Sequence, residues 1–374
     1  MKPTIVSHDA YLRAVTLRDL TDPAQGPHAL QMLLDRITHA LRERWGCAVR
    51  VHRAHPAVPV EHNYDRLHYP PGGAARDARY TRYVSETTVL RSQTSAMIPS
   101  LLAEIAQDPP ADVLLACPGL VYRRDEIDRL HTGEPHQVDL WRIVRGRVGT
   151  DDLRGMVATV LDAVLPGRAY RLNDAAHPYT TDGVEIEVRS DDGGWIEAGE
   201  CGLALPAILR EADLPGEYTG LAMGLGLDRL LMLVKGMDDI RALRSADPRI
   251  AAQMLDLEPY RPVSAQPPVR RDLSVAVAAD RTPEELGDRI REALGERVEA
   301  LESVQVLSET PYDALPPQAR ERIGMRPGQK NVLVRIVIRD LARTLTSAEA
   351  NALRDAVYAS LHEGSAWQWA SAAA

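Results

Sequence analysis

Two periodic patterns of apolar residues run along the chain, separated by polar stretches rich in proline and glycine. From 26 to 45, leucine and isoleucine recur at 30, 33, 34, 37 and 41, the spacing of one helical face. Over 137–144, apolar and polar residues alternate, which predicts a half-buried β-strand. The same patterns predict helices over 94–107 and 150–164 and strands over 47–51, 112–117, 121–125, 184–188 and 194–198.

The predicted strands fall into hairpins. A polar loop separates 121–125 from 137–144, and a Ser-Asp-Asp-Gly-Gly turn separates 184–188 from 194–198. Hairpins interspersed with helices imply an antiparallel sheet flanked by helices, an α+β domain. Residues 55–84 carry several prolines and glycines, and we expect a long functional loop there.

The composition changes after Met254, where prolines at 259, 262, 267 and 268 mark a linker. The patterns that follow predict a strand over 273–278, a helix over 283–294, strands over 298–307 and 331–338, and a helix over 347–362. This βαββα order is typical of a small ferredoxin-like domain. The predicted organisation is an N-terminal arm (1–25), a first domain (26–255), a linker (256–267), a second domain (268–364) and a frayed tail (365–374).

Composition places the chain among ordinary globular proteins, with 374 residues, 45% hydrophobic and 26% charged. A net charge of −9 excludes a protein that coats nucleic acid with a generally basic surface, but it is compatible with a local basic groove. Cys47, Cys117 and Cys201 are too scattered for a disulfide framework or a metal site. The first residues lack an apolar signal region and no run reaches membrane-spanning length, so we expect a cytoplasmic protein.

Phenylalanine is absent from the whole chain, whereas tyrosine occurs 12 times and tryptophan 5 times. A chain of this length would ordinarily carry on the order of a dozen phenylalanines. Chance is a poor explanation for the absence, and aromatic residues as a class are not excluded.

The stretch from Gly220 to Arg229 is the first candidate for chemistry. Gly224 and Gly226 would let the backbone come close to a ligand, and Arg229 would open an apolar helix. A guanidinium in this position suits a nucleotide, because it pairs with phosphate or stacks on a base. On these residues alone, a glycine-rich turn followed by a solvated arginine is the more common explanation.

Several further stretches carry a family resemblance when they are taken together. They are Asn63-Tyr64-Asp65, Leu90-Arg91-Ser92-Gln93-Thr94-Ser95, Val121-Tyr122-Arg123-Arg124-Asp125 with His131-Thr132 and His136-Gln137, Gly224-Leu225-Gly226-Leu227-Asp228-Arg229, Arg270-Arg271-Asp272-Leu273, and Arg339 to Leu345. In this order they resemble the phenylalanine–tRNA ligases of class II, including their motifs 2 and 3 and their ferredoxin-fold anticodon-binding domain. The resemblance covers residues 26–364, as in the single-chain members of that family.

The resemblance implies an aminoacyl-tRNA synthetase, an AMP-forming ligase of protein biosynthesis. Such an enzyme uses ATP and Mg²⁺ to activate phenylalanine, or a phenylalanine-like aromatic amino acid, and transfers it to tRNA. Residues 268–364 would contact the tRNA. The helix at 26–45 matches the family's motif 1, a common dimer interface, so a homodimer and a monomer are both open.

The resemblance also assigns site residues. Arg123 and Arg229 would be the catalytic cations, since activation of a carboxylate by ATP needs positive charge at the phosphates and no covalent nucleophile. ATP would be bound by Arg123, His131, His136, Glu197, Gly224, Gly226 and Arg229, with Glu197 also a ligand for Mg²⁺. The amino acid would be bound by Ser95, Gln137, Asp139, His177, Tyr179, Glu200 and Ala222. The structural alternatives are a surface ion pair for Arg123 and outward-facing polar positions for Gln137 and Asp139.

The chain departs from the family at several of these places. The family has Phe-Pro-Phe where His177-Pro178-Tyr179 stands, glycine at Glu200, histidine at Gln93, an aromatic residue at Pro135, and glutamate at Thr181. One hypothesis is that all phenylalanine was purged while the substrate stayed phenylalanine-like, and we favour it. A second is a pocket for a non-standard or more polar aromatic amino acid, because buried polar groups need partners. A third is a tRNA-binding regulatory protein with impaired catalysis.

Overall fold

The computed structural model describes residues 5–367, which divide into two compact units. Unit 1 holds the chain up to residue 123 together with 134–238 and 252–260. Unit 2 holds 124–133, 239–251 and the chain from 261 onward. Among the described residues, no helix is long and apolar enough to cross a membrane.

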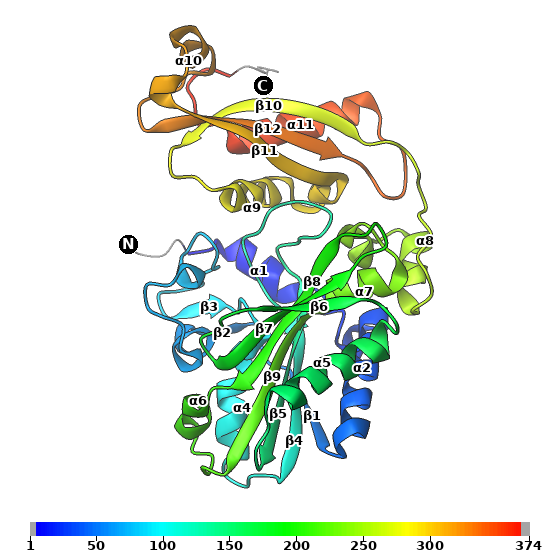
Figure 1. Ribbon diagram of the computed structural model, residues 1–374. Coiled ribbons are helices and arrows are strands. Elements are labelled where there is room, and N and C mark those ends of the chain that lie inside the picture. Colours follow the sequence, from blue (N-terminus) through cyan, green and yellow to red (C-terminus); the bar gives the residue numbers. More distant parts are fainter. Residues whose placement is uncertain (1–4, 368–374) are drawn as a thin grey trace. The chain divides into compact units, whose positions relative to one another are not determined.

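Unit 1 is built on a seven-stranded sheet in the order β1-β4-β5-β9-β8-β7-β6 (Figure 1). Only β1 and β4 pair in parallel, and every other neighbouring pair is antiparallel. The strands are β1 (Ala48–Val51), β4 (Asp112–Leu120), β5 (His136–Arg145), β6 (Tyr170–Asp174), β7 (Thr180–Arg189), β8 (Trp195–Ala204) and β9 (Tyr218–Gly226). The predicted antiparallel sheet is therefore confirmed, with β5, β9 and β8 at its centre.

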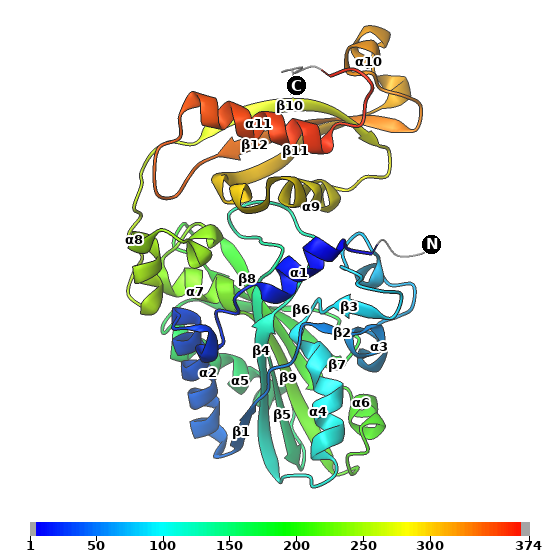
Figure 2. The same cartoon turned by 180° about the vertical axis from the view of Figure 1, so that it is seen from behind.

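Helices cover both faces of this sheet (Figures 1 and 2). On one face lie α2 (Ala29–Trp45), α5 (Thr150–Val164) and α7 (Leu227–Lys235). On the other, α4 (Ile98–Ile105) and α6 (Pro206–Glu211) close a core with inward side chains of β4, β5 and β9. Because side chains alternate along a strand, the pairing register decides which residues reach which core.

The polar N-terminal segment departs from the predicted arm. It contains α1 (His8–Thr16), whose N-terminus is capped by Ser7: the Ala10 N–H donates to the Ser7 hydroxyl at 3.2 Å. Ala14 is the one buried residue of this helix, and Tyr11 and Val15 pack partly buried beside it. This apolar face is shorter than the roughly 11 to 18 residues over which a helical period is read from a sequence, so the helix was missed. Residues 1–4 of the predicted arm lie outside the described part of the chain.

Two predicted elements have different bounds. The predicted strand 121–125 is not one: β4 ends at Leu120, and beyond it Val121 N–H donates to Pro135 C=O at 2.9 Å, closing the hairpin loop. The predicted helix over 94–107 begins as a 3₁₀ turn (Thr94–Met97) and becomes α-helical only at Ile98, with Pro99 in its first turn. The remaining elements of unit 1 are the short pieces β2 (Ala57–Pro59), α3 (Val60–Asn63) and β3 (Thr88–Leu90).

Unit 2 has a three-stranded antiparallel sheet in the order β10-β12-β11. The predicted succession of strand, helix, two strands and helix is present, with a short helix over 317–323 where a loop was predicted between the last two strands. Unit 2 comprises α8 (Pro248–Ala251), β10 (Val269–Ala278), α9 (Pro283–Leu294), β11 (Leu301–Pro311), α10 (Pro317–Ile323), β12 (Gln329–Ile338) and α11 (Ser347–Leu361). Capping boxes start α9 and α11.

The first residues of the predicted frayed tail are ordered. Ser365 N–H donates to Gly324 C=O at 2.9 Å, and the Trp367 ring meets the Tyr358 ring edge-on at 5.7 Å. Residues 368–374 of that predicted tail lie outside the described residues.

Residues 124–133, which follow the motif-2-like stretch, pack as part of unit 2. Ile127 lies in the apolar core of that unit, and its carbonyl accepts the Val304 N–H at 2.8 Å. Arg291 on α9 donates to the carbonyls of Asp125 at 2.5 Å and Glu126 at 2.6 Å. Gly287 permits this close approach, since a Cβ there would stand 2.8 Å from the Asp125 carbonyl oxygen.

We predict that Arg291→Ala loosens the segment 124–133 without unfolding unit 2. Loss of two hydrogen bonds from a charged donor costs about 1–3 kcal/mol locally. Backbone amides of this segment should then exchange with solvent roughly tenfold faster or more, as measured by hydrogen exchange. Arg297→Ala, at an exposed position just beyond the end of α9, is the control and should leave the exchange unchanged. Equal protection in both variants would show that Arg291 does not hold the segment.

Candidate functional site

The site is organised around Gly224 on β9, which pairs with Asp139 of β5 on one side and Glu200 of β8 on the other. Directly opposed residues project to the same face of a sheet, so both carboxylate side chains flank this glycine. An added Cβ at Gly224 would meet no atom within 4 Å. An open space therefore lies over the middle of the sheet, between two acidic residues.

Asp139 is the most unusual group beside this space. Its side chain is buried, and both oxygens are occupied: the Ser95 hydroxyl donates to Oδ2 and the Trp141 indole N–H donates to Oδ1 at 2.7 Å. Burial raises the pKa of Asp139 to about 6, although both hydrogen bonds act to lower it. A buried carboxylate that titrates near neutrality is typical of a ligand-binding or catalytic position.

Aromatic rings form one side of the site. The Tyr179 ring lies 6.2 Å from that of Trp141 with only 25° between their planes, and 6.2 Å from that of Tyr69. Tyr69 donates to Gln93 Oε1 at 2.8 Å, and burial raises the pKa of Tyr69 to about 12. The charges that also influence the pKa of Tyr69 are those of Arg123, Glu200 and Asp139. Side chains from distant parts of unit 1 therefore share one environment.

His177 and Glu200 lie side by side at the same site. His177 Nε2 lies 2.9 Å from Glu200 Oε2, and the His177 ring lies 6.1 Å from that of Tyr179. The contact with His177 holds the pKa of Glu200 below its ordinary value, and the nearby charge of Arg123 acts in the same direction. The two side chains therefore approach each other, although His177 Nε2 makes no hydrogen bond of good geometry to any of the described residues and the Glu200 side chain is 43% exposed.

The two predicted catalytic cations are both held by unit 1. Arg123 donates from Nε to the Ser92 carbonyl at 2.8 Å. Arg229, near the start of α7, pairs with Glu197 of β8 at 3.2 Å. Glu197, the predicted Mg²⁺ ligand, is therefore engaged by Arg229, and the described residues contain no cluster of three or more metal-binding side chains.

The two predicted ATP-binding histidines belong to different units. His136 is fully buried and faces away from the site, because it alternates with Gln137 along β5. Its Nε2 accepts the Leu20 N–H at 3.1 Å, so Nδ1 carries a proton toward Asp228 Oδ1 at 2.7 Å. His131 belongs to the segment in unit 2, where it contacts Asp128 at 2.8 Å. The structure therefore does not bring His136 into the Gly224 site.

The resemblance also implies that Leu221 and Met223, which stand where the family has phenylalanine, line the substrate pocket, and the same alternation shows this to be wrong. Ala222 and Gly224 face the site, so Leu221 and Met223 point to the core on the other side of the sheet. Gln137 and Gly226 are paired directly and stand on the site face.

Sequence reasoning missed Trp141 and Tyr69 as site residues. Trp141 lies two positions after Asp139 on an alternating strand, and this spacing could have placed both on one face. Tyr69 lies in an irregular loop, and no periodicity in the sequence points to it.

Comparison with known proteins identifies the class to which this antiparallel sheet, with its buried acid and its glycine opening, belongs. The model of the family described as tRNA synthetases class II core domain (F) matches residues 15–254. The chain belongs to this family.

Curated relatives of this chain are named phenylalanine–tRNA ligase alpha subunits. The protein of Nostoc punctiforme is 31% identical over 240 residues, covering 64% of this chain and 70% of the relative. That of Prochlorococcus marinus (strain MIT 9313) is 34% identical over 242 residues, covering 63% and 69%. Among solved structures, a pyrrolysyl tRNA synthetase of Desulfitobacterium hafniense matches with 17% identity and a TM-score of 0.44, over 63% of this chain and 78% of that one.

We predict that Gly224→Ala fills the open space without harming the fold. Because the new methyl group meets no atom within 4 Å, the free energy of unfolding should change by less than about 0.5 kcal/mol. Binding of the site's ligands should weaken measurably. Gly199→Ala is the matched control on β8, where a Cβ would stand 2.1 Å from the Gly224 carbonyl oxygen, and it should cost about 1–3 kcal/mol of stability. A destabilised Gly224→Ala would show that the space is not open.

Proposed function

We propose that this chain is an aminoacyl-tRNA synthetase that activates an amino acid with ATP and transfers it to tRNA. The observation that carries the proposal is the buried Asp139 carboxylate beside the opening at Gly224, on the face that also presents Gln137. An α-ammonium group is the partner that a buried carboxylate of this kind accepts most favourably. Phenylalanine, the amino acid in the relatives' names, is the reference substrate.

In the proposed reaction, the ammonium group binds Asp139 with help from Ser95 and Gln137. The amino-acid carboxylate attacks the α-phosphorus of ATP, an aminoacyl adenylate forms, and pyrophosphate leaves. Arg123 compensates the charge on the carboxylate and the α-phosphate, since a planar guanidinium can bridge both.

Arg229 binds a part of ATP away from the α-phosphate, either the adenine ring or the γ-phosphate. Gly224 and Gly226 leave the backbone accessible to the nucleotide. Mg²⁺ would screen the phosphates, and Glu197 is the carboxylate to hold it once Arg229 turns to ATP. Residues 268–364 are proposed to bind tRNA, and the protein to act in the cytoplasm, where translation takes place.

The assembly of the chain is a separate part of the proposal. A homodimer and a monomer are the two alternatives from the sequence. The relatives are named alpha subunits, a term for one chain of a larger assembly, so a complex with a different chain is a third.

Amino-acid-dependent exchange of pyrophosphate into ATP tests the proposal directly. Exchange with phenylalanine or another amino acid supports it, and no exchange with any of the standard amino acids would contradict it.

We predict that Arg229→Ala lowers this exchange about 10²–10³-fold, because one charge on the phosphates is lost in the transition state. Binding of tRNA, measured by filter retention, should stay within about twofold. Arg145→Ala is the control, since Arg145 is an exposed residue at the far end of β5. If Arg229→Ala exchanges pyrophosphate at the wild-type rate, Arg229 does not take part in binding ATP.

A further inference from the structure

The apolar end of the site is occupied by the protein's own Trp141. Its indole is fully buried, stands directly opposite Ala222 across the β5–β9 pair, and lies beside the Tyr179 ring. The small side chain of Ala222 leaves the room that the indole fills. The space next to Asp139 that an aromatic side chain would need is therefore already taken by an aromatic side chain.

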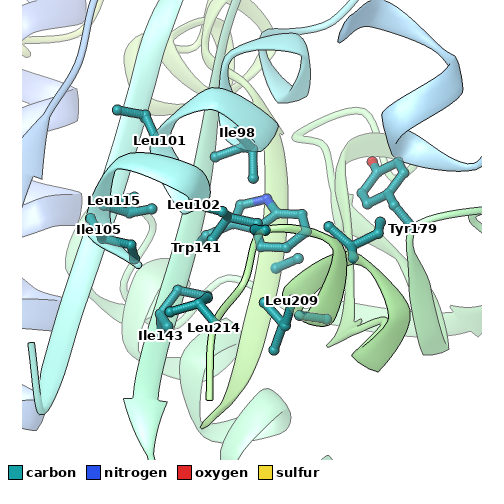
Figure 3. Close-up of a cluster of buried hydrophobic side chains, with 14 of the residues drawn as sticks. Ile98, Leu101, Leu102, Ile105, Leu115, Trp141, Ile143, Tyr179, Leu209 and Leu214 are labelled. Atoms are coloured by element: carbon teal, nitrogen blue, oxygen red, sulfur yellow. The ribbon is translucent and has the colours of Figure 1, made fainter. Parts of the chain in front are cut away.

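Trp141 is held in this place from several sides. Side chains of α4 and α6 surround it in one buried cluster, in which Figure 3 shows it between α4 and Tyr179. Leu115 of β4 is its direct neighbour on the other strand. The indole N–H also donates to Asp139 at 2.7 Å, which fixes the orientation of the ring. Because buried side chains are close-packed, moving the indole would open a cavity and leave Asp139 without one of its donors.

We infer that Trp141 sets the size of the amino-acid side chain that the site accepts, and that it favours side chains more compact than a phenyl ring. This inference rests on the proposed function, because it names the substrate class of the same site. The free space lies over Gly224, next to the carboxylates of Asp139 and Glu200, and not over Ala222. An amino acid bound to Asp139 therefore has room for a short side chain over Gly224.

A phenyl ring could enter only if the indole left its place. Part of the binding free energy of phenylalanine would be used to displace the indole, so the KM for phenylalanine would be higher. A compact amino acid binds without this displacement.

The test is a series at one position: wild type, Trp141→Phe, Trp141→Leu and Trp141→Ala. Pyrophosphate exchange is measured with phenylalanine and with a compact set of alanine, serine, valine and threonine. Wild type should use at least one compact amino acid more efficiently than phenylalanine. The kcat/KM for phenylalanine relative to that amino acid should rise along the series, reaching at least tenfold in Trp141→Leu or Trp141→Ala, mainly through KM. All three variants lose the N–H donor to Asp139 and differ from one another in side-chain volume, so the trend among them reports the effect of volume alone.

Trp45→Ala is the matched control, since Trp45 ends α2 and stacks on Arg142 on the other side of the sheet. It should leave the preference among amino acids unchanged. Circular dichroism verifies that each variant folds. If Trp141→Ala fails to fold, Trp141→Leu still tests the effect of a smaller side chain. A constant preference across folded variants, or a wild type that prefers phenylalanine, would overturn the inference. Absence of exchange with every amino acid in the wild type would instead overturn the proposed function.

Discussion

The buried carboxylate of Asp139 is the constraint on which the rest of the site depends. A charge in the interior needs donors, and here Ser95 and Trp141 supply one to each oxygen. Ser95 comes from the 3₁₀ turn before α4 and Trp141 from the same strand, so the carboxylate joins the helix layer to the centre of the sheet. The pairing of β5 with β9 then sets Gly224 beside it. A shift of one residue in this register would turn all of these groups to the opposite face.

The fold was largely predictable because its elements bury one face each. The helix over 150–164 was predicted with its observed bounds, and the order of elements in unit 2 follows from the same periodicity. Prediction failed where the buried apolar face is short or where polar contacts hold a segment in place. The helix at His8–Thr16 fully buries only Ala14. The segment 124–133 joins unit 2 through its backbone carbonyls, the side chain of Ile127 and the ion pairs of Arg124 with Asp288 and Arg129 with Glu302.

The site was less predictable than the fold, for a physical reason. Residues on one strand can be placed from the period of two, which groups Asp139 with Gln137 and also separates His136 from them. The partners that give these groups their properties come from long-range packing. Tyr69 approaches from a loop, and His177 and Glu200 pair between separate stretches of chain. The family resemblance indicated the positions, and only the packing shows that Trp141 fills the space between them.

The central claim is that Asp139 binds the α-ammonium group of the amino acid, and its titration tests this most directly. The measurement is kcat/KM for the amino acid in pyrophosphate exchange from pH 5 to pH 8, in wild type and in Asp139→Asn. Because burial raises the pKa of Asp139 to about 6, the carboxylate is protonated below that pH and cannot pair with the ammonium group. The account predicts a wild-type value that falls about tenfold per pH unit below pH 6, and a low, flat profile for Asp139→Asn. An Asp139→Asn enzyme with wild-type efficiency and the same pH profile would contradict it.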